Sequence, residues 1–330
     1  MKAIVIEEFG TADVMHLTDV PDPTVRQGQV LVDIHATSVN TADAKARELG
    51  HALDFVPPLP ARLGMDFAGT VAAVGEGVDG FAVGDEVYGC AGGVVGHDGA
   101  LAERLAADAR LVALKPASLT MVEAAALPLV AITAYEALVD RMNVRPGMSV
   151  LVHGGAGGVG HVAIQIASAL GARVFATGRP NHRDVIASLG AEPIDFTSEP
   201  VDAYVERLTG GKGFDRVFDT VGSENIATSF AATKLNGHVA TTVSLCELDL
   251  TLAHVRGLSL HVIYMLLPMI HGSGRERHGE ILHEVAKLAD DGKLKPIVDG
   301  TYPLAQAADA HRRLESGEAT GKVVVTTRDE

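Results

Sequence analysis

The sequence has very few of the residues that build disulfide frameworks, zinc lobes or stacking surfaces. Its 330 residues include only two cysteines, Cys90 and Cys246, no tryptophan, and 4% aromatic residues. Two cysteines so far apart in sequence exclude a disulfide framework or a cysteine-rich zinc lobe, and they suit a reducing cytoplasm. Few aromatic side chains leave few platforms for nucleic-acid bases. We therefore expect a cytoplasmic protein without structural disulfides.

Positive charge and long apolar runs are scarce as well. Lysine and arginine number 27 against 42 acidic residues, which gives a formal net charge of −15. Such a chain repels nucleic acid and anionic membranes, so neither is expected as a partner. No run of 18 apolar residues occurs, and the apolar stretch 258–270 is interrupted by His261 and Pro268. We expect no transmembrane helix, and residues 1–8 resemble the start of a strand more than a signal peptide.

Periodicity in the remaining sequence predicts two domains of different construction. Residues 1–122 give short strands separated by glycine and proline turns, with a glycine-rich, mobile loop at 89–99. Between residues 149 and 266, six strands alternate with helices, which is typical of a doubly wound parallel sheet. The helices and strands after Pro268 cannot extend a completed sheet of that kind. The predicted fold class is therefore α/β: a Rossmann domain, 123–267, inserted into a β-rich domain formed by 1–122 and 268–330.

Some local elements are also predicted from pattern. A short helix is expected over 38–47 with Thr41 as its N-cap, and another over 161–170. A helical pattern covers 121–141 and is broken by Pro128. A short strand is expected at 295–298.

The organising motif is a glycine-rich turn between an apolar strand and an apolar helix. Gly155, Gly157 and Gly160 fill the three positions of the G-x-G-x-x-G dinucleotide fingerprint, within the stretch 149–170. The glycines permit the turn, the approach of a pyrophosphate, and close packing of helix on strand. The exposed N–H groups and positive dipole end of the helix favour an anion there. We predict a dinucleotide site that also includes Ala156, Gly158 and Val159.

The end of the following strand predicts which dinucleotide binds. An NAD-preferring site places an acidic residue about twenty positions after the glycine turn, where it binds the ribose 2′-hydroxyl. This chain instead has Thr177 and Arg179. A guanidinium with no competing carboxylate favours a 2′-phosphate. NADPH is therefore the predicted cofactor, with Arg179 the main contact and Thr177 a secondary one.

The residues available for a catalytic zinc ion do not suit it. Zinc-dependent alcohol dehydrogenases of similar layout need a thiolate where Asn40 stands and a histidine where Met65 stands, and no cysteine occurs near 129–134. Neither an asparagine amide nor a thioether suits Zn²⁺. His271, His278 and His283 lie in a polar segment without ligand spacing and are expected to be solvated. We expect no catalytic metal.

Several further stretches complete a resemblance that runs nearly end to end. Together with the glycine turn and its helix, residues 38–43, 64–69, 83–87, 132–138 and 321–325 resemble the zinc-free quinone oxidoreductase branch of the medium-chain dehydrogenase/reductase superfamily. The resemblance implies a GroES-like catalytic domain around a Rossmann domain, with an active site in the cleft between them. It implies a homodimer, with 258–266 available for edge pairing. It places Asn40 and Asp43 in the cleft and Thr133 beside the nicotinamide, and we expect these three residues to be catalytic. Asn40, Thr133 and Ser244 are also predicted cofactor contacts.

The resemblance implies NADPH-dependent hydride transfer to a quinone or an α,β-unsaturated carbonyl. Such acceptors delocalise the charge left by the hydride, so no metal is required to stabilise it. The Asn40 amide could donate to a substrate or cofactor oxygen, Asp43 is more plausible as an orienting group, and Tyr88 and Tyr264 are possible hydroxyl donors. Two alternatives stay open: an enoyl-thioester reductase or alcohol dehydrogenase-like enzyme, and a non-catalytic NADPH-binding redox sensor.

Overall fold

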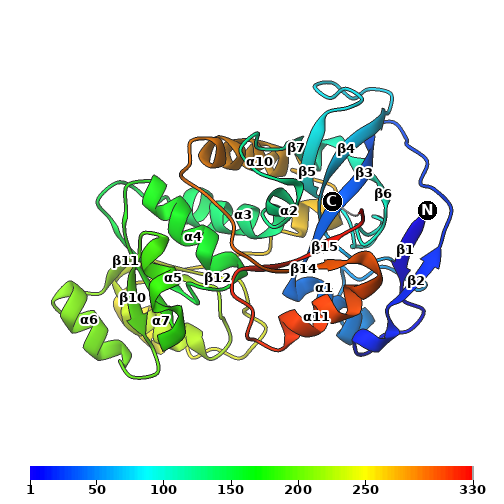
Figure 1. Ribbon diagram of the computed structural model, residues 1–330. Coiled ribbons are helices and arrows are strands. Elements are labelled where there is room, and N and C mark those ends of the chain that lie inside the picture. Colours follow the sequence, from blue (N-terminus) through cyan, green and yellow to red (C-terminus); the bar gives the residue numbers. More distant parts are fainter. Residues whose placement is uncertain (329–330) are drawn as a thin grey trace. The chain divides into compact units, whose positions relative to one another are not determined.

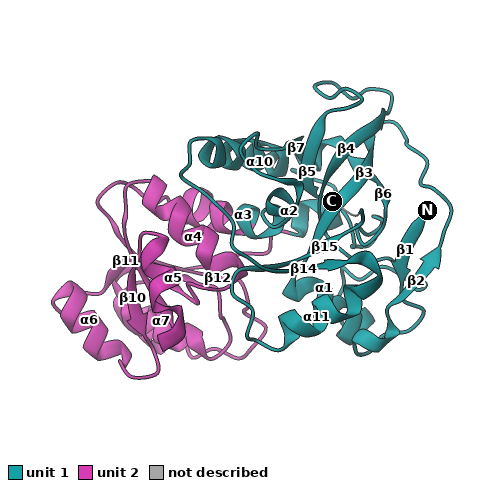
Figure 2. Cartoon of the chain, in the orientation of Figure 1, with its two compact units in different colours: residues 1–132, 266–330 teal, residues 133–265 magenta. Residues whose placement is uncertain are grey.

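A computed structural model describes residues 1–328, which belong to two compact units shown in Figure 2. Unit 1 contains residues 1–132 and the chain from residue 266 onward, and unit 2 contains residues 133–265. These divisions fall ten residues after and two residues before the boundaries predicted from the sequence. The assignment of a cofactor domain and a catalytic domain to these segments stays a prediction. Among the described residues, no helix has the length and apolar character needed to cross a membrane.

Unit 2 is built on a six-stranded sheet in which all pairings are parallel. Its strands are β8 (Ser149–His153), β9 (Arg173–Gly178), β10 (Glu192–Asp195), β11 (Phe214–Asp219), β12 (Thr233–Thr241) and β13 (Ser259–Val262). Their spatial order is β10-β9-β8-β11-β12-β13, so the chain moves outward from β8 to one edge and then returns to build the other half. This is the doubly wound arrangement. The predicted fold class is confirmed.

Helices connect these strands, as Figure 1 shows. They are α4 (Gly158–Ala169), α5 (Arg183–Ser188), α6 (Val201–Thr209), α7 (Asn225–Ala232) and α8 (Thr251–Arg256). Helix α4 is almost entirely buried along its length, because it carries apolar residues on nearly all sides. A helix of this kind packs its start closely against the strand that precedes it.

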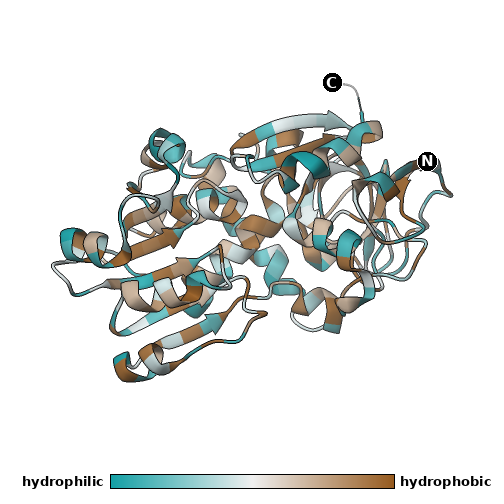
Figure 3. Cartoon of the chain, turned by 90° about the horizontal axis from the view of Figure 1, so that it is seen from below, coloured by the Kyte–Doolittle hydropathy of each residue, from teal (hydrophilic) through white to brown (hydrophobic). Residues whose placement is uncertain are grey.

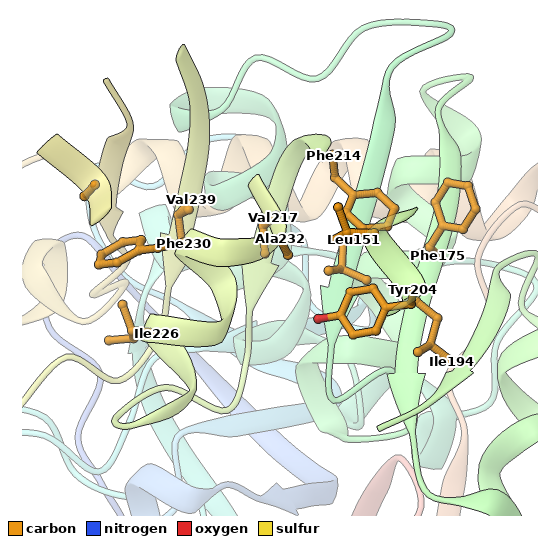
Figure 4. Packing of buried hydrophobic residues seen from close by; sticks show 12 residues of the cluster. Leu151, Phe175, Ile194, Tyr204, Phe214, Val217, Ile226, Phe230, Ala232 and Val239 are labelled. Carbon is orange, nitrogen blue, oxygen red and sulfur yellow. The ribbon is translucent and has the colours of Figure 1, made fainter. Parts of the chain in front are cut away.

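A hydrophobic cluster holds β8, β9 and β11 together. Phe175 and Phe214 have ring centroids 5.2 Å apart, and Tyr204 from α6 packs against Phe214 (Figure 4). Hydrophobic residues run along the strands in Figure 3. Burial of each such aromatic ring contributes roughly 1.5–3 kcal/mol, so these strands are fixed relative to one another.

Unit 1 contains a seven-stranded sheet with mostly antiparallel pairings. Its strands are β3 (Gln29–Val39), β4 (Asp66–Val74), β5 (Glu86–Cys90), β6 (Arg104–Asp108), β7 (Val112–Leu114), β14 (Val298–Pro303) and β15 (Lys322–Thr326). The order is β14-β15-β3-β4-β5-β7, and β6 pairs with β3. The strands β14 and β15 therefore return to the first part of the chain, as the sequence predicted. β1 (Lys2–Val5) and β2 (His16–Asp19) form a separate pair.

The remaining helices of unit 1 cover this sheet or lie beside it. They are α1 (Thr41–Leu49), α2 (Met121–Ala125), α9 (Leu267–His271), α10 (Glu276–Asp290) and α11 (Ala307–Glu315). α3 (Pro128–Tyr135) begins at a proline, which has no N–H to leave unpaired, and continues into a π-helical turn, 136–141. The predicted break at Pro128 is confirmed.

Several predicted boundaries are wrong, each for an identifiable reason. α1 begins at Thr41 with Asn40 as its N-cap, because Asp43 closes a capping box with Asn40, while residue 38 belongs to β3. α4 begins at Gly158 instead of residue 161, since glycines at a helix start are tolerated when strand packing requires them. The strand expected at 295–298 lies at Val298–Pro303, where it pairs with β15.

Candidate active site

The glycine turn of unit 2 is a place where side chains do not fit. Gly154 adopts a left-handed conformation with φ of 75°, which lets the chain leave β8. A Cβ on Gly155 would lie 2.7 Å from the Cβ of Ala176, and one on Gly160 would lie closer than 3 Å to the Gly154 carbonyl oxygen. The left-handed residue is thus Gly154, one position before the fingerprint. Gly155 and Gly160 are needed for close packing of the turn on β9 and α4.

The start of α4 offers backbone donors. Gly157 is the N-cap and its own N–H donates to Gly154 O at 3.0 Å. The N–H groups of Gly158, Val159 and Gly160 lie in the first helical turn, where no intrahelical acceptor exists. Together with the helix dipole they form a site that favours an anion. The donor set fits the pyrophosphate of a dinucleotide, although the roles of these residues and of Ala156 stay predictions.

The end of β9 is tied to this turn through Thr177. Its backbone carbonyl accepts from Gly155 N–H at 2.9 Å, and its hydroxyl accepts from Gly154 N–H at 3.2 Å. Its hydroxyl also lies 3.2 Å from Nδ1 of the buried His153. Burial lowers the pKa of His153 to about 4, against an opposing effect of Asp219, so the ring is neutral at physiological pH. Thr177 therefore holds the turn in place by accepting hydrogen bonds from Gly154 and Gly155.

Arg179 is placed differently from Thr177. Its side chain is exposed, and it makes no hydrogen bond or ion pair with any described residue. No acidic residue stands at the end of β9 to compete with an anion for it. This arrangement suits the 2′-phosphate contact that the sequence predicts.

Asp219, at the end of β11, is a residue that sequence reasoning missed. Its carboxylate is fully buried and accepts from Val221 N–H, Gly222 N–H and the Ser229 hydroxyl, at 2.8–2.9 Å. It therefore shapes the turn that follows β11, at the carboxyl ends of the strands, where the glycine turn also lies. A carboxylate at the end of a buried strand was the available signal.

Ser244, three residues beyond β12, is half-buried, and its carbonyl accepts from Cys246 N–H at 2.9 Å.

In unit 1, Asn40 and Asp43 come together at the start of α1. Asn40 N–H donates to Asp43 Oδ2 at 2.9 Å, which closes the capping box. The Asn40 amide Nδ2 donates to Asp66 Oδ2 at 2.8 Å and to Asp43 Oδ2 at 3.2 Å. Its Oδ1 accepts from Lys322 Nζ. Every polar atom of the Asn40 side chain is thus engaged inside the protein, and its predicted role as a donor to substrate or cofactor requires it to leave these partners.

Lys322 supplies the only positive charge in this group among the described residues. It is 2% exposed, and its Nζ donates to Val39 O at 3.1 Å and lies 3.6 Å from Asp66 Oδ2. Asp66 is also held by Ser38 Oγ at 2.8 Å and by Leu129 N–H at 2.8 Å. We call Ser38, Asn40, Asp43, Asp66, Cys90 and Lys322 the buried polar cluster.

The charges of the buried polar cluster do not balance, and this imbalance shifts its titration. Burial, reinforced by Asp66, raises the pKa of Asp43 to about 7. Burial lowers the pKa of Lys322 against the opposing attraction of Asp66 and Asp43. Burial raises the pKa of the Cys90 thiol, so this cysteine is a neutral, unreactive thiol. With two carboxyl groups and one ammonium, the cluster retains a proton at Asp43 near neutral pH.

No three or more histidine, cysteine, aspartate or glutamate side chains within residues 1–328 are grouped so as to hold a metal ion. At the position compared with zinc enzymes, Asp66 uses both carboxylate oxygens for hydrogen bonds. The expectation of a metal-free reaction stays a prediction.

The expectation that His278 is solvated is wrong. The His278 side chain is 3% exposed and lies on the apolar face of α10, whereas His271 and His283 are exposed.

The two candidate tyrosines differ. Tyr88 is fully buried, and its hydroxyl donates to Leu282 O at 2.5 Å, so it serves the packing of α10. Tyr264 is 39% exposed.

Thr133 is 5% exposed and lies on α3, the helix in which the chain passes from unit 1 to unit 2. The structure thus brings Asn40 and Asp43 together in unit 1, and the glycine turn, Thr177 and Arg179 together in unit 2.

Comparisons with known proteins agree with this architecture. Residues 26–117 match the alcohol dehydrogenase GroES-like domain family, and residues 189–325 match a family described as zinc-binding dehydrogenase. A 2-methylene-furan-3-one reductase of Solanum lycopersicum is 36% identical over 98% of this chain and 79% of its own length. The chain belongs to the quinone oxidoreductase branch of the medium-chain dehydrogenase/reductase superfamily. The resemblance inferred from its motifs is confirmed.

Other relatives and solved structures are 26–43% identical to this chain. An NADPH-dependent alkenal/one oxidoreductase of Arabidopsis thaliana is 33% identical over 98% of this chain and 79% of its own length. An alcohol dehydrogenase superfamily protein from Novosphingobium aromaticivorans has a TM-score of 0.95 and 43% identity, covering 99% of this chain and 100% of its own. The Escherichia coli quinone oxidoreductase complexed with NADPH has a TM-score of 0.87 and 26% identity, covering 99% of each chain. The chain also matches 14% of a Streptomyces orinoci polyketide synthase system protein, at 33% identity over 96% of its residues.

Proposed function

We propose that this protein is an NADPH-dependent reductase that transfers hydride to a quinone or an α,β-unsaturated carbonyl. The observation that carries the proposal is the glycine turn, in which a Cβ on Gly155 or Gly160 would collide with neighbouring atoms, next to an Arg179 side chain that has no hydrogen bond or ion pair among the described residues. The names of an alkenal/one oxidoreductase and of a quinone oxidoreductase solved with NADPH support both the cofactor and the acceptor class.

The residues of unit 2 hold the cofactor in this proposal. The N–H groups of 158–160 bind the pyrophosphate, Arg179 binds the 2′-phosphate, and Thr177 keeps the turn in position. Thr133 contacts the nicotinamide, and Ser244 is a further contact of the cofactor. When bound, the reduced nicotinamide supplies the hydride.

Unit 1 supplies two of the three predicted catalytic residues, Asn40 and Asp43, and Thr133 on α3 is the third. Asn40 and Asp43 orient the acceptor or the cofactor, with Asp43 stabilising the start of α1 that carries Asn40. A quinone or enone delocalises the negative charge that it gains, so hydrogen bonds and positioning suffice for reduction. The side chains of Asn40 and Met65 are poor zinc ligands, which supports a reaction without metal.

The test compares NADPH and NADH with wild type and Arg179→Ala, using a simple quinone, an enone and an enoyl-CoA, each with and without chelator. We expect quinone or enone turnover that chelator leaves unchanged. Loss of the guanidinium should lower kcat/KM with NADPH by roughly tenfold to a hundredfold, the value of about 1.5–3 kcal/mol for a charge-assisted hydrogen bond, and should leave NADH little changed. An equal loss for both cofactors would exclude this role of Arg179, and chelator sensitivity would exclude the metal-free reaction.

An enoyl-thioester reductase is the second candidate, because the chain matches a segment of a polyketide synthase system protein. Turnover of the enoyl-CoA in preference to the enone would favour it. Tight NADPH binding without turnover of any acceptor would favour a redox sensor.

We further propose that the protein is a cytoplasmic homodimer joined through β13. This strand forms one edge of the parallel sheet; its last residue, Val262, is 52% exposed, and Tyr264, two residues further on, is 39% exposed. Exposed apolar residues beside an unpaired strand edge favour pairing with a second copy. Sedimentation of the protein as a monomer at micromolar concentration would contradict the dimer.

A further inference from the structure

A histidine folds back over the point where the chain leaves β9. The turn at Pro180–His182 is closed by His182 N–H, which donates to Arg179 O at 2.9 Å. A Cβ built on Gly178 would lie 3.2 Å from the Cβ of His182 and 3.8 Å from its Nδ1. The imidazole therefore lies against Gly178, and the charge of Arg179 acts on it.

The same turn lies next to the predicted pyrophosphate site. The Ile186 Cδ1 atom would be 2.5 Å from a Cβ on Gly178 and 3.4 Å from a Cβ on Gly155, so this side chain packs beneath both glycines. The Thr177 carbonyl, one residue before Gly178, accepts from Gly155 N–H. Arg179 and His182 are thus positioned on the backbone that borders the glycine turn.

Both side chains are available to a ligand. Arg179 is exposed and His182 is half-buried, and neither forms a hydrogen bond or ion pair with a side chain in the described part of the protein. Burial and the charge of Arg179 lower the pKa of His182. Arg183 and Asp184 follow on α5, while Gly178 and Ile186, which contact this turn, carry no charge. The imidazole is therefore neutral near neutral pH unless an anion approaches.

We propose that His182 is a second ligand of the cofactor 2′-phosphate and takes up a proton when that phosphate binds. The inference rests on the proposed function, since it assumes that the 2′-phosphate lies at Arg179. A phosphate dianion attracts the imidazolium and offsets the repulsion from Arg179. Affinity for NADP⁺ then increases as the pH falls, by up to about tenfold per pH unit over the range in which the free ring is neutral and the bound ring is charged. NAD⁺ has no such group and should bind without this dependence.

The test measures dissociation constants of NADP⁺ and NAD⁺ by calorimetry from about pH 6 to about pH 8, a range that brackets an ordinary histidine pKa. Wild type is compared with His182→Asn, which cannot be charged, and His182→Lys, which is always charged. Runs in two buffers of different ionisation enthalpy count the protons taken up. The phosphate of free NADP⁺ titrates near pH 6 in all three experiments, and a positive charge at residue 182 lowers the pKa of the bound phosphate. Proton uptake is therefore compared at and above about pH 7, where the phosphate is mainly a dianion and the difference between proteins isolates residue 182.

We expect wild type to take up more protons per NADP⁺ than either variant. His182→Asn should bind NADP⁺ severalfold more weakly at the acidic end only, and His182→Lys should keep tight binding with a flatter pH profile. An unchanged proton uptake in His182→Asn would overturn the inference. Arg179→Ala separates the two levels: if it weakens NADP⁺ selectively while His182→Asn behaves as wild type, only the role of His182 fails. If Arg179→Ala weakens both cofactors equally, the 2′-phosphate site itself fails.

Discussion

Removal of the buried ammonium of Lys322 should destabilise unit 1 far more than removal of an exposed one. Lys322→Met keeps an unbranched apolar stem, removes the ammonium, and leaves Asp43 and Asp66 without their only buried cation among the described residues. Breaking a buried ion pair in this way costs about 3–5 kcal/mol, because the remaining charge is buried and uncompensated. The matched control is Lys295→Met: that side chain is 74% exposed and pairs with Glu123 at 3.2 Å. An exposed pair of this kind contributes about 0–1 kcal/mol.

The pH dependence of this effect has a definite sign. The pKa of Asp43 is raised from 3.8 to about 7 in the folded protein, so between these values the folded chain holds a proton that the unfolded chain has released. Its contribution to stability is therefore present at low pH and is lost as the pH rises through this window, by at most about 1.4 kcal/mol per pH unit. Asp43→Asn removes that slope. His153, with a pKa lowered to about 4, has the opposite slope, so the difference between wild type and Asp43→Asn isolates Asp43.

Urea unfolding followed by circular dichroism, at about pH 5 and about pH 8, measures both effects. We expect the loss in Lys322→Met to be larger at the higher pH, where Asp43 is ionised, and Asp43→Asn to restore part of it in the double variant. If Lys322→Met loses no more stability than Lys295→Met at the higher pH, the electrostatic account of the buried polar cluster is refuted.

Two further substitutions test the turn and the tyrosine. Gly160→Ala places a Cβ closer than 3 Å to the Gly154 carbonyl oxygen. We expect at least a tenfold loss of NADPH affinity, measured by fluorescence quenching or calorimetry, since a change of about 1.4 kcal/mol in binding free energy suffices for that. Wild-type affinity in this variant would mean that the turn does not contact the cofactor. Tyr88→Phe removes only the bond from its hydroxyl to Leu282 O, so we expect a loss of about 1 kcal/mol in unfolding free energy with kcat/KM unchanged. A large loss of activity with unchanged stability would instead give Tyr88 a catalytic role.

The sequence predicted the two-part fold because the alternation of apolar strands and helices is strong from residue 149 onward. Because six strands already complete a doubly wound sheet, the later strand β15 was expected to return to the first sheet. Boundaries were less accurate where side chains decide them. α1 begins at Thr41 with Asn40 as its N-cap, because Asn40 and Asp43 form a capping box, a local spacing that could have placed this boundary. His278 was assigned to a polar segment, yet it shares one helical face with Ile281, Leu282 and Val285, a spacing that could have placed it.

The buried polar cluster could not be read from the sequence, because its members are far apart in it. Lys322 reaches Asn40 only through the antiparallel pairing of β15 with β3, in which Val323 lies opposite Val39. That register is fixed by the assembled sheet and by no local signal. His182 was missed for a related reason: its position over Gly178 depends on a tight turn whose geometry Pro180 and Arg179 set together.

The most direct test of the central claim follows the hydride itself. NADPH carrying deuterium at both hydrogen positions of nicotinamide C4 is incubated with chelator-treated protein and a simple enone, and the product is analysed by mass spectrometry and NMR. We expect one deuterium on the β-carbon of the saturated ketone, formed at the same rate with and without chelator. A product without deuterium, or a reaction that resumes only when zinc is restored, would contradict it.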